Sequence, residues 1–472
     1  MSNITEILIN SEHINILKIA GQLGKDMDIK TFIVGGYLRD AILERNLKDI
    51  DIMVENNVFE FSRKLSKKLG VNKTVEFEKF HTVKIPYRQC EIEIANSRAE
   101  TYDTNSRKPE TVNLTTVEED LIRRDFTINA LAASIIPDTF GKLIDSFNGL
   151  KDLNNGIINT PTDPDTTFID DPLRMLRAIR FASQLEFEID PRIKESINNN
   201  KNRISIVSQE RITAEIIKIL NSKKPSISFY ILKELDFLKL IFPELDIMSG
   251  VDIINKKGHK DIFIHTLEVV DNAAKLSKKM KIRFAALVHD IAKPATKKFD
   301  KDKGWTFHGH EEIGRRMLIK IAKRMKISND LRDYLMNLTK LHLRPIALAK
   351  KEISDSAIRR VMFEAGEHID DLMKLCRADI TTKNPTKIKK YMSNFERVEK
   401  LMQDVKIKDE MKAFKSPVDG KKIMETFSLN EGKIVGLIKK EIEEAILDDK
   451  IPNTYKDAFN YMLKIKSDFI KN

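Results

Sequence analysis

An early stretch of the chain, residues 32–55, contains two carboxylates separated by a single residue. These are Asp49 and Asp51, and β-type residues follow them. If both lie on a strand, the period of two places them on the same face, about 7 Å apart. Two carboxylates in that arrangement can share divalent cations, normally Mg²⁺ held together with substrate phosphates. Two such ions can stabilise both the attacking and the leaving oxygen of an in-line phosphoryl displacement.

A glycine pair and an arginine precede the two carboxylates. Gly35 and Gly36 follow an apolar run, and Arg39 comes one helical turn later. Glycine lets backbone N–H groups approach a triphosphate closely at the start of a following helix. Arg39 can add charge-assisted hydrogen bonds to the phosphates. An Asp-x-Asp alone is usually a solvated loop and a glycine pair is usually a turn, but the combination in this order favours a nucleotide site.

A second polar cluster follows in "EEDLIRRDFTINAL", residues 118–131. We expect Arg123, Arg124, Asp125 and Asn129 to gather at the start of one helix. The arginines can meet phosphate there, and the aspartate can accept a hydrogen bond from a ribose 2′-hydroxyl, the group that distinguishes RNA from DNA. A surface patch of salt bridges is the alternative interpretation of this string.

The segment "DDPLRMLRAIRFASQLEF" carries charged residues at every third position. On a helix, Asp171, Arg174, Arg177 and Arg180 would each neighbour the next. A carboxylate only accepts hydrogen bonds and a guanidinium only donates them. Side by side they match the Watson–Crick edges of cytosine and adenine, which present a donor beside an acceptor, and they reject guanine and uracil. The alternative is an ordinary amphipathic helix with a salt bridge between its turns.

Histidines and aspartates recur later in the chain in an order that suits a metal ion. The members of this set are His265, His289, Asp290 and Asp379, with His310 and His342 as further imidazoles. If helices bring these side chains together, they can bind a divalent transition metal. A single histidine is more often structural, so the prediction depends on the whole ordered set.

The composition is that of a globular protein. Of 472 residues, 41% are hydrophobic and 32% are charged. No uncharged apolar run approaches the roughly 20 residues that span a bilayer, so we expect no membrane segment. Cys90 and Cys376 lie far apart and in no metal-ligand spacing, so we expect a reducing, cytoplasmic location and no disulfide framework.

The net charge of +11 is unevenly distributed along the chain. Residues 1–250 carry 34 Lys and Arg against 38 Asp and Glu, whereas the rest of the chain carries 48 against 33. A basic half suits a polyanionic partner such as nucleic acid. A lysine-rich solubilising surface would show the same excess. Oligomeric state is left open by the sequence.

The order of elements predicts an α/β head followed by helices. After a leading helical region at 1–28, short β-type runs occur at Phe32–Val34, Asp51–Val54, Thr82–Ile85 and Glu91–Ala95. Residues 97–120 lack an apolar period and are expected to form a long loop, which in a compact domain is usually functional. After residue 170 the pattern is helical to the end. We predict a head at 1–155, a neck at 156–250, a third module at 251–395 and a helical tail at 396–472.

These motifs resemble those of the class II tRNA nucleotidyltransferase and bacterial poly(A) polymerase family, within the polymerase-beta-like superfamily. "GGYLRD…DIDIMV" resembles the family's motif A, and Arg-Arg-Asp with Asn four residues later resembles motif B. Motif D of the family is Glu-Asp-x-x-Arg, and here Asp170 replaces the glutamate while Asp171 and Arg174 are retained. The ordered histidines and aspartates of the third module resemble the HD phosphohydrolase family.

Two further assignments implied by the resemblance stay open. Family members often use a third acidic residue on a later strand, and Glu91 and Glu93 are both available. Residues 208–220, with Glu210, Arg211 and Glu215, resemble the motif that closes the catalytic core, but a plain amphipathic helix fits them equally.

The resemblance implies an α+β fold, with a polymerase-beta-like nucleotidyltransferase head followed by all-α neck, HD and tail modules. It implies that Asp49 and Asp51 hold Mg²⁺, that Asp125 reads the ribose, and that Asp171 and Arg174 select the base. The remaining nucleotide-binding residues that it implies are Gly35, Gly36, Arg39, Arg124, Asn129, Arg177 and Arg180.

The activity implied is template-free addition of C, C and A to the 3′ end of tRNA from CTP and ATP. A poly(A) polymerase, or a partial enzyme adding only CC or only A, would share every motif of the head. An HD phosphohydrolase with a nucleotide-sensing head is a further alternative, although a sensor needs no metal-binding carboxylates. A non-catalytic RNA-binding protein would leave both acidic constellations unexplained.

Overall fold

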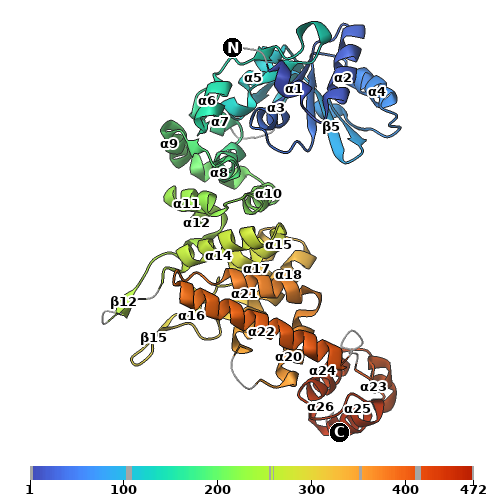
Figure 1. Cartoon of the computed structure of the whole chain (residues 1–472), viewed down its shortest axis with the longest axis vertical. Coiled ribbons are helices and arrows are strands. Elements are labelled where there is room, and N and C mark those ends of the chain that lie inside the picture. The colour runs from blue at the N-terminus through green and yellow to red at the C-terminus, as the bar shows by residue number, and fades with distance from the viewer. Residues whose placement is uncertain are drawn as a thin grey trace. The chain divides into compact units, whose positions relative to one another are not determined.

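The structure, a computed structural model, describes residues 4–102, 109–254, 257–258, 260–349, 353–409 and 416–469. The chain divides into two compact units, Met1–Asp246 and Ile247–Asn472. In Figure 1 the first unit is coloured from blue to green and the second from yellow-green to red. The first unit has a β-sheet head followed by helices, and the described part of the second is mainly helical, which confirms the predicted α+β class.

The head is built on a mixed sheet of seven described strands, in the order β3-β4-β5-β2-β1-β8-β9. Their bounds are β1 Thr31–Val34, β2 Ile50–Val54, β3 Val75–Phe77, β4 Thr82–Tyr87, β5 Cys90–Asn96, β8 Ala132–Ser134 and β9 Leu143–Ile144. The four predicted β-type runs correspond to β1, β2, β4 and β5, so these predictions are confirmed. The strand pair that matters most for the site is β2 with β5, because it is parallel and places residues of the same spacing side by side.

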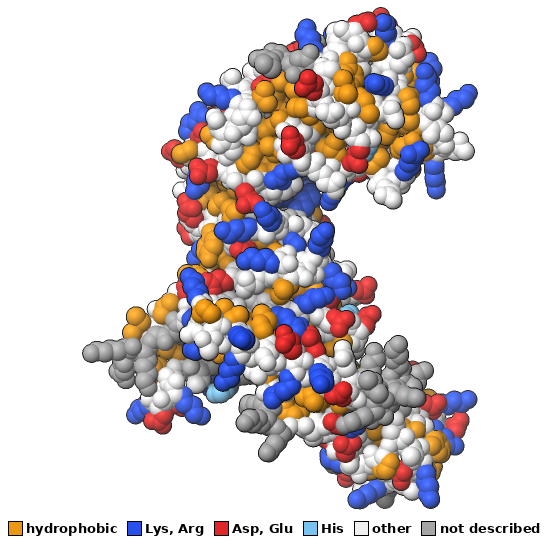
Figure 2. Space-filling view, viewed as in Figure 1, with side chains coloured by type: hydrophobic (Ala, Val, Ile, Leu, Met, Phe, Trp, Pro, Cys, Tyr) orange, Lys and Arg blue, Asp and Glu red, His pale blue; other side chains and the backbone are white. Residues whose placement is uncertain are grey.

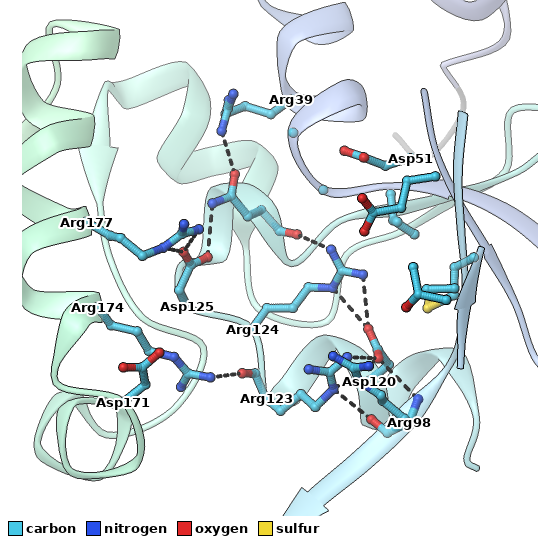
Figure 3. Close-up of a pocket in the computed structure, with 18 of the residues that line it drawn as sticks. Arg39, Asp51, Arg98, Asp120, Arg123, Arg124, Asp125, Asp171, Arg174 and Arg177 are labelled. Atoms are coloured by element: carbon cyan, nitrogen blue, oxygen red, sulfur yellow. Dashed lines mark hydrogen bonds and ion pairs between the residues drawn. The ribbon is translucent and has the colours of Figure 1, made fainter. Parts of the chain in front are cut away.

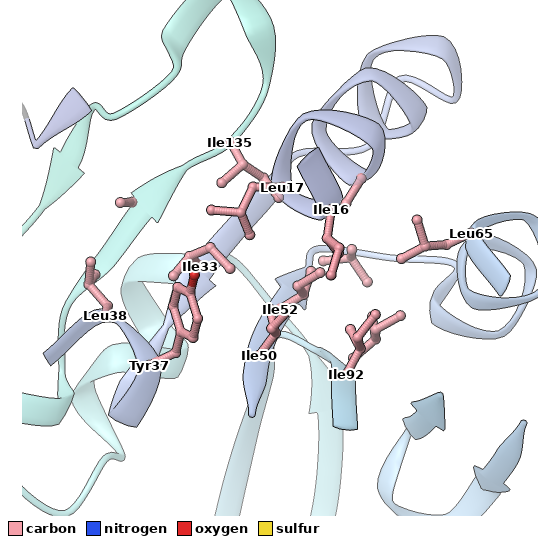
Figure 4. Close-up of a cluster of buried hydrophobic side chains, with 14 of the residues drawn as sticks. Ile16, Leu17, Ile33, Tyr37, Leu38, Ile50, Ile52, Leu65, Ile92 and Ile135 are labelled. Carbon is pink, nitrogen blue, oxygen red and sulfur yellow. The ribbon is translucent and has the colours of Figure 1, made fainter. Parts of the chain in front are cut away.

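The two faces of this sheet bury different side chains. Ile33 of β1 and Ile52 of β2 face the larger hydrophobic cluster, to which α2 (Ile14–Asp26) and α4 (Val58–Lys68) contribute, as Figure 4 shows. Phe32 and Met53, their neighbours in sequence, belong to a separate cluster on the other side. Side chains alternate along a strand. The carboxylates of β2 and β5 therefore stand on the side of the sheet away from the larger cluster.

The prediction of a long loop at 97–120 is wrong. The described residues form a β-hairpin of β6 (Arg98–Tyr102) and β7 (Pro109–Leu114), followed by the helix α5 (Val117–Ile122). Residues 103–108 lie outside the described residues. A hairpin is held by hydrogen bonds between its two backbones, and strands rich in polar residues show no period-two apolar pattern, so the sequence gives little signal for it. The side chain of Thr116 caps α5 by accepting a hydrogen bond from the backbone of Glu119.

Helices complete the first unit. Their bounds are α1 Thr5–Ile9, α3 Gly35–Ile42, α6 Gly149–Asn155, α7 Pro164–Asp170, α8 Leu173–Leu185, α9 Pro191–Asn200, α10 Gln209–Leu220, α11 Ser226–Glu234, α12 Leu238–Ile241 and α13 Pro243–Asp246. The two short strands β10 (Ile157–Ile158) and β11 (Glu188–Ile189) pair in parallel and flank α7 and α8 in sequence.

The second unit is a set of packed helices. Their bounds are α14 Ile262–Leu276, α15 Met280–Val288, α16 Lys293–Thr296, α17 His310–Arg324, α18 Asn329–Leu341, α19 Arg344–Ala347, α20 Asp355–Ala365, α21 Ile369–Ala378, α22 Pro385–Asp409, α23 Gly420–Phe427, α24 Lys433–Leu447, α25 Tyr455–Lys464 and α26 Lys466–Phe469. The boundary proposed between residues 395 and 396 falls within α22. Short hairpins, β12–β13 (Ile253–Ile254 with Lys257–Gly258) and β14–β15 (Lys298–Asp300 with Gly304–Thr306), interrupt the region predicted to be wholly helical.

Among the described residues, every helix is too short or too polar to cross a membrane.

Gly21 offers a test of how α2 packs on the sheet. A Cβ at this position would lie 1.8 Å from the backbone oxygen of Ile135, just beyond β8. We therefore expect Gly21→Ala to lower the free energy of unfolding of the first unit by about 1–3 kcal/mol or more, as overpacking does. Hydrogen exchange read by mass spectrometry is the measurement, because it reports the head strands separately from the second unit.

Gly436 in α24 is the matched control, because a Cβ there would have no heavy atom within 4 Å. Gly436→Ala should preserve or raise stability by up to about 1 kcal/mol through helix propensity. Equal protection of the head strands in Gly21→Ala and in the wild-type protein would contradict the close approach of α2.

Candidate functional site

A cavity of about 880 Å³ lies between the head and the helices that follow it in the first unit. Eight arginines and five carboxylates line it, so it carries an excess of positive charge. Figure 2 shows Lys and Arg side chains gathered where the head meets these helices. The arginines are Arg39, Arg98, Arg123, Arg124, Arg174, Arg177, Arg180 and Arg211, and the carboxylates are Asp51, Glu93, Asp120, Asp125 and Asp171. A cavity of this size and charge suits a phosphorylated small molecule.

Asp51 and Glu93 stand side by side on the sheet. The parallel register of β2 and β5 pairs Asp51 with Glu93, and both line the cavity. Asp49 lies just before β2, is exposed, and accepts a hydrogen bond of 3.2 Å from the backbone N–H of Glu91 through its carboxylate Oδ1. Nζ of Lys84 lies 2.5 Å from Glu91 and 3.3 Å from Glu93, and Glu91, like Asp49, is not among the residues that line the cavity. Of the two open candidates for a third acidic residue, the geometry favours Glu93.

The pKa of Asp51 is shifted by its surroundings. Burial raises the pKa of Asp51 to about 6, and the neighbouring charges of Glu93 and Asp49 add to the rise. The backbone N–H of Tyr37 donates to its Oδ2 at 3.3 Å and acts in the opposite direction. A bound cation would stabilise the ionised form, and carboxylate oxygens are the ligands that Mg²⁺ prefers. The residues present therefore fit a magnesium site.

The glycine pair forms the start of α3, directly after β1. Gly35 has a φ of +62°, and a Cβ on it would lie 2.9 Å from Nη1 of Arg124, so a side chain here would be both strained and crowded. A Cβ on Gly36 would lie 3.6 Å from Oδ2 of Asp51. Both glycines line the cavity. The absence of side chains leaves the first turn of the helix open to a ligand beside the acidic group.

Arg39 is buried and already has protein partners. Its Nη1 donates to Oδ1 of Asn129 at 2.8 Å, and its Nε donates to Oδ1 of Asp40 at 2.9 Å. Its guanidinium also lies over the ring of Phe181, 5.1 Å from the centroid. In this structure Arg39 therefore links α3 to the motif around Asn129, as the dashed line in Figure 3 shows, and forms part of the cavity wall.

Asp120 is a residue that the sequence reasoning missed. It is buried on α5, and its Oδ2 accepts from Nε of Arg124 at 3.1 Å while its Oδ1 accepts from Arg123. Burial by itself raises the pKa of Asp120, but the charges of the two arginines outweigh it, and the pKa is lowered. The signal was present in the sequence, because spacings of three and four residues on a helix bring an acid and an arginine together.

Asp125 lies at the centre of a buried hydrogen-bonded group. Its Oδ1 accepts from Nδ2 of Asn129 at 3.0 Å, and its Oδ2 accepts from Nε of Arg177 at 2.7 Å. Burial alone raises its pKa, but the charge and hydrogen bonds of Arg177, together with the bond from Asn129, lower it to about 2. The carboxylate is therefore ionised and can only accept hydrogen bonds at neutral pH.

The predicted position of this motif at the start of one helix is wrong. Arg123 follows the last residue of α5, and Asn129 ends a separate 3₁₀ turn, Thr127–Asn129. The chain changes direction between them, because Phe126 adopts an extended conformation. Tertiary packing brings the side chains together instead of a shared helix.

The motif at 170–187 is also partly corrected. Arg174, Arg177 and Arg180 lie on α8 as predicted, but Asp171 precedes the helix with an extended backbone, φ −138° and ψ 100°. The residue before a proline is disfavoured in helical conformation, and Pro172 follows directly. Asp171 and Arg174 nevertheless line the same cavity.

Each member of the predicted base-reading pair has a protein partner in this structure. Nη2 of Arg211 donates to Oδ2 of Asp171 at 3.0 Å, and Nη2 of Arg174 donates to the carbonyl of Arg123 at 2.7 Å. Figure 3 shows Asp171 and Arg174 close together at one end of the cavity. Arg211, which the sequence reasoning treated only as support, thus lies directly beside the pair.

The remaining arginine of α8 is a buried structural contact. Nε of Arg180 lies 2.6 Å from Oε2 of Glu215 on α10, and its guanidinium lies 4.0 Å from the centre of the Phe181 ring. Burial lowers the pKa of Arg180 to about 10, and the charge of Glu215 opposes that change. Phe181, which carries no chemical signal in the sequence, supports three of the cavity arginines.

The second unit brings together the histidines and aspartates of the predicted metal set. They come from the helix α14 and from the ends of α15, α17, α18 and α21. Nε2 of His265 lies 3.0 Å from Oδ1 of Asp379, and Nε2 of His289 lies 3.2 Å from Oδ2 of Asp290. Nε2 of His310 lies 3.3 Å from Oδ1 of Asp290.

Two groups of three ligands result, with one carboxylate between them. The first is His265, His289 and Asp379, and the second is Asp290, His310 and His342. One oxygen of Asp290 faces each group. His310 and His342, the further imidazoles of the sequence prediction, join the cluster through Asp290.

The orientation of the imidazoles suits metal binding. Nδ1 of His289, His310 and His342 each lies 2.7–2.8 Å from a backbone carbonyl oxygen, which holds the ring with Nε2 toward the cluster. Burial lowers the pKa of His342 to about 4, and the charge of His289 lowers it further. Nε2 of His289 and both oxygens of Asp290 are buried without a well-aligned hydrogen-bond partner among the described residues. The cluster therefore fits a divalent transition metal.

The raised pKa of Asp51 generates a prediction about cation binding. A proton and a cation compete for the same carboxylate, so affinity should be complete above pH 6 and should fall by about tenfold per unit below it. The measurement is Mn²⁺ binding by electron paramagnetic resonance between pH 5 and 8. Without a cation, the stability of the first unit should fall as the pH rises to about 6. The reason is that the raised pKa of Asp51 disfavours the ionised form in the folded state.

The binding is measured in a background that carries both His289→Ala and His310→Ala, because these changes interrupt both ligand groups of the histidine cluster. Asp51→Asn in that background is the control and should bind weakly at every pH. An affinity that stays constant from pH 8 to pH 5 would contradict the assignment of Asp51 as a ligand.

Known protein families match three successive parts of the chain. The Poly A polymerase head domain matches residues 31–159, and the probable RNA and SrmB-binding site of polymerase A matches residues 186–248. The HD domain matches residues 262–382. The first match lies within the unit that holds the arginine-lined cavity, the second ends two residues beyond that unit, and the third contains the histidine cluster.

Relatives and solved structures agree with these matches. The Multifunctional CCA protein of Pseudoalteromonas atlantica is 32% identical over 364 residues, covering 74% of this chain and 85% of that protein. That of Shewanella frigidimarina is 33% identical over 323 residues, covering 66% and 74%. The Bacillus stearothermophilus CCA-adding enzyme in complex with CTP shares the fold, with a TM-score of 0.63, 21% identity and coverage of 97% and 98%.

The Thermotoga maritima CCA-adding enzyme complexed with tRNA_CCA also shares the fold, with a TM-score of 0.56, 20% identity and coverage of 98% of both chains. The chain therefore belongs to the tRNA nucleotidyltransferase and poly(A) polymerase family, as a nucleotidyltransferase that carries an HD domain.

Proposed function

We propose that the chain adds C, C and A to the 3′ end of tRNA from CTP and ATP with Mg²⁺. The observation that carries this proposal is the single cavity that holds both the acidic pair Asp51 and Glu93 and the base-reading pair Asp171 and Arg174. Support also comes from the relatives, which are Multifunctional CCA proteins, and from CCA-adding enzymes of the same fold complexed with CTP, ATP and tRNA_CCA.

The reaction joins the RNA 3′-hydroxyl to the α-phosphorus of the nucleotide. A new oxygen–phosphorus bond forms, the bond to pyrophosphate breaks, and the hydroxyl proton passes to solvent. Mg²⁺, held by Asp49 and Asp51 with Glu93, would neutralise charge on the triphosphate and favour loss of the hydroxyl proton. Arg124 and Arg177 add fixed positive charge to the same cavity. The ionised Asp125 accepts a hydrogen bond from the ribose 2′-hydroxyl, which a deoxynucleotide lacks.

Base choice follows from the donor and acceptor order of Asp171 and Arg174. The carboxylate accepts from the amino group of cytosine or adenine, and the guanidinium donates to the adjacent ring nitrogen. In this structure Asp171 accepts from Arg211, and Arg174 donates to the carbonyl of Arg123. A base would make contacts of the same kind, because its amino group donates to Asp171 as Arg211 does. Its ring nitrogen accepts from Arg174 as the carbonyl of Arg123 does.

The other assignments complete the proposal. The head at 1–155 performs the chemistry, the neck at 156–250 holds the base-reading residues, and the HD module at 251–395 and the tail at 396–472 provide basic surface for the tRNA. The A-form duplex of tRNA offers little readable sequence, so binding by shape and backbone suits that surface. The two unpaired cysteines suit a reducing cytoplasmic location.

Addition to defined tRNAs tests this function. We expect a tRNA lacking its terminus to receive two C and one A, with no further addition, when each nucleotide is supplied in turn. Arg174→Ala should relax base choice by about 1–3 kcal/mol, since a bidentate reader supplies discrimination of that size. Gel analysis of single-nucleotide extension measures both results.

Asp51→Ala is the control for chemistry and should abolish addition while tRNA binding persists. Long A tails on unstructured RNA, with no C used, would assign the chain to the poly(A) polymerases instead. Addition of only CC or only A would identify a partial enzyme. An equal loss for all four nucleotides in Arg174→Ala would show that this residue is structural.

A second activity is favoured by the histidine cluster. We propose that the HD module hydrolyses a phosphate ester at a damaged RNA 3′ end, a 2′,3′-cyclic phosphate or a phosphomonoester. The bound metal would supply a water of lowered pKa as nucleophile. The chain's own contribution is the cluster around Asp290, with Lys293 close to that carboxylate at 2.5 Å. Hydrolysis would leave the free 3′-hydroxyl that nucleotide addition requires.

Replacement of one cluster residue tests the second activity. His289→Ala should reduce bound transition metal and abolish hydrolysis, because His289 is one of the three ligands of the first group. Addition of C and A to a clean 3′-hydroxyl should stay unchanged. Elemental analysis after reconstitution and release of phosphate are the measurements. If the wild-type protein binds no transition metal and releases no phosphate, the module is only a scaffold for tRNA.

A further inference from the structure

One face of the head sheet extends from the arginine-lined cavity to the outermost described strand, β3. Asp51 of β2 pairs with Glu93 of β5. Glu93 pairs in turn with Lys84 of β4, and Lys84 pairs with Val75 of β3. Residues that stand directly opposite each other on neighbouring strands point to the same face of the sheet. The row of side chains that begins with the acidic pair therefore ends at Val75.

A second row of side chains lies beside the first and includes part of the cavity wall. Met53 of β2 pairs with Ala95 of β5, and Ala95 pairs with Thr82 of β4. All three line the cavity, and Thr82 pairs with Phe77 of β3. Neighbouring strands lie about 5 Å apart, so β3 runs about 10 Å from the strand that carries Glu93. Phe77 therefore stands on the cavity face, close to the carboxylates.

Large apolar side chains are exposed at this edge of the sheet. Val75 is 49% exposed and Phe77 is 40% exposed. Phe80, which ends the 3₁₀ turn Glu78–Phe80 directly after β3, is 47% exposed. A group of exposed apolar side chains marks an interaction site, whereas single ones do not. We call Val75, Phe77 and Phe80 the β3 platform.

Hydrogen bonds tie the β3 platform to the cavity wall. The carbonyl oxygen of Phe80 accepts a hydrogen bond of 2.6 Å from Nη1 of Arg98 and one of 3.0 Å from the hydroxyl of Thr82. Arg98, labelled in Figure 3, and Thr82 both line the cavity. The platform therefore adjoins the arginine-lined cavity. The guanidinium of Arg98 brings positive charge to this junction, which suits a phosphate group.

The position of the β3 platform restricts the chemistry of its partner. Nucleotide addition requires the 3′-hydroxyl of the RNA to reach a cation held by Asp51 and Glu93, so the last nucleotides must lie close to that pair. Unpaired bases of single-stranded RNA stack on aromatic side chains. Stacking tolerates every base, because each base has a π face. This tolerance suits a 3′ end whose last base changes after each addition.

We propose that the β3 platform binds the unpaired bases at the 3′ end of the RNA substrate, with Phe77 and Phe80 as the stacking surfaces. The inference rests on the proposed addition of nucleotides to an RNA end, and it names the residues that hold that end. The incoming nucleotide contacts the arginine-lined cavity, whereas the RNA end contacts the edge of the same sheet.

The fluorescence of a tRNA that carries 2-aminopurine as its last unpaired base tests the inference. Stacking on an aromatic ring changes the fluorescence of this base, so binding to the wild-type protein should change the signal. The double variant Phe77→Ala and Phe80→Ala should abolish the change and weaken binding of this RNA by roughly 5- to 100-fold. Phe77→Tyr with Phe80→Tyr should retain both, because tyrosine also stacks on bases.

Three controls separate the β3 platform from the rest of the protein. Phe363→Ala changes a phenylalanine of α20 that is 41% exposed, and it should have no effect. Calorimetric titration with CTP should give the same affinity for the wild-type protein and the double alanine variant, which shows that the head is folded. A tRNA that ends within its paired acceptor stem has no unpaired 3′ base, so it should bind equally to both proteins.

A photochemical crosslink gives an answer that does not depend on variants. A 4-thiouridine at the last unpaired position of the RNA should crosslink to a wild-type peptide that contains residues 75–80, as read by mass spectrometry. Crosslinks only to other peptides, or unchanged fluorescence and affinity in the double alanine variant, would overturn the inference. Altered sedimentation of that variant without RNA, together with unchanged RNA binding, would assign the platform to a protein contact and would also overturn it.

The same measurements distinguish the inference from the proposed function. Loss of RNA-end binding in the double alanine variant of a protein that makes long A tails would leave the inference standing and refute CCA addition. Addition of two C and one A by a protein whose double alanine variant binds the RNA end normally would do the reverse.

Discussion

Asp51 and Glu93 stand side by side because β2 and β5 pair in parallel register. The candidate site of the first unit depends on this pair of neighbouring negative charges. Burial raises the pKa of Asp51 to about 6, and the charge of the neighbouring Glu93 adds to the rise. Positive charge nearby, from a cation or from neighbouring side chains, favours the ionised form of the carboxylate. The arginines of the surrounding cavity supply such charge.

The cavity arginines are subject to a different constraint. Each guanidinium must be held in position while it keeps its charge. Asp120 pairs with Arg123 and Arg124. Asp125 pairs with Arg177, and Glu215 pairs with Arg180. Pairing of this kind offsets the cost of burying a guanidinium and fixes its direction. The result is a rigid cavity in which positive charge exceeds negative charge, so that a triphosphate finds donors already oriented.

The same principle operates in the second unit with different ligands. Asp290 is buried between two groups of imidazoles, and the charge of His289 holds the pKa of Asp290 well below its usual range. Backbone carbonyls fix the rings so that their Nε2 atoms converge. Imidazole favours transition metals where carboxylate alone favours Mg²⁺. The chain thus contains two groups of candidate metal ligands, one of carboxylates in the head and one rich in imidazoles in the second unit.

The sequence alone determined the types and the order of the reactive residues, and with them the family. It also located the strands β1, β2, β4 and β5, because alternation along a half-buried strand and the glycine pair leave local patterns. These predictions use only residues that are close together in the sequence. They are correct where the contacting residues lie within one helical turn or one strand. The spacing of Arg174, Arg177 and Arg180 on α8 is such a case.

Only the tertiary structure decided how distant residues meet. It separated Glu93 from Glu91, which alternation cannot rank, and it brought Arg211 of α10 to Asp171. It placed the ring of Phe181 in the wall of the arginine-lined cavity, although Phe181 carries no chemical signal in its own segment. The physical reason is that such contacts depend on strand register and on helix packing, which the whole chain sets and no short segment records.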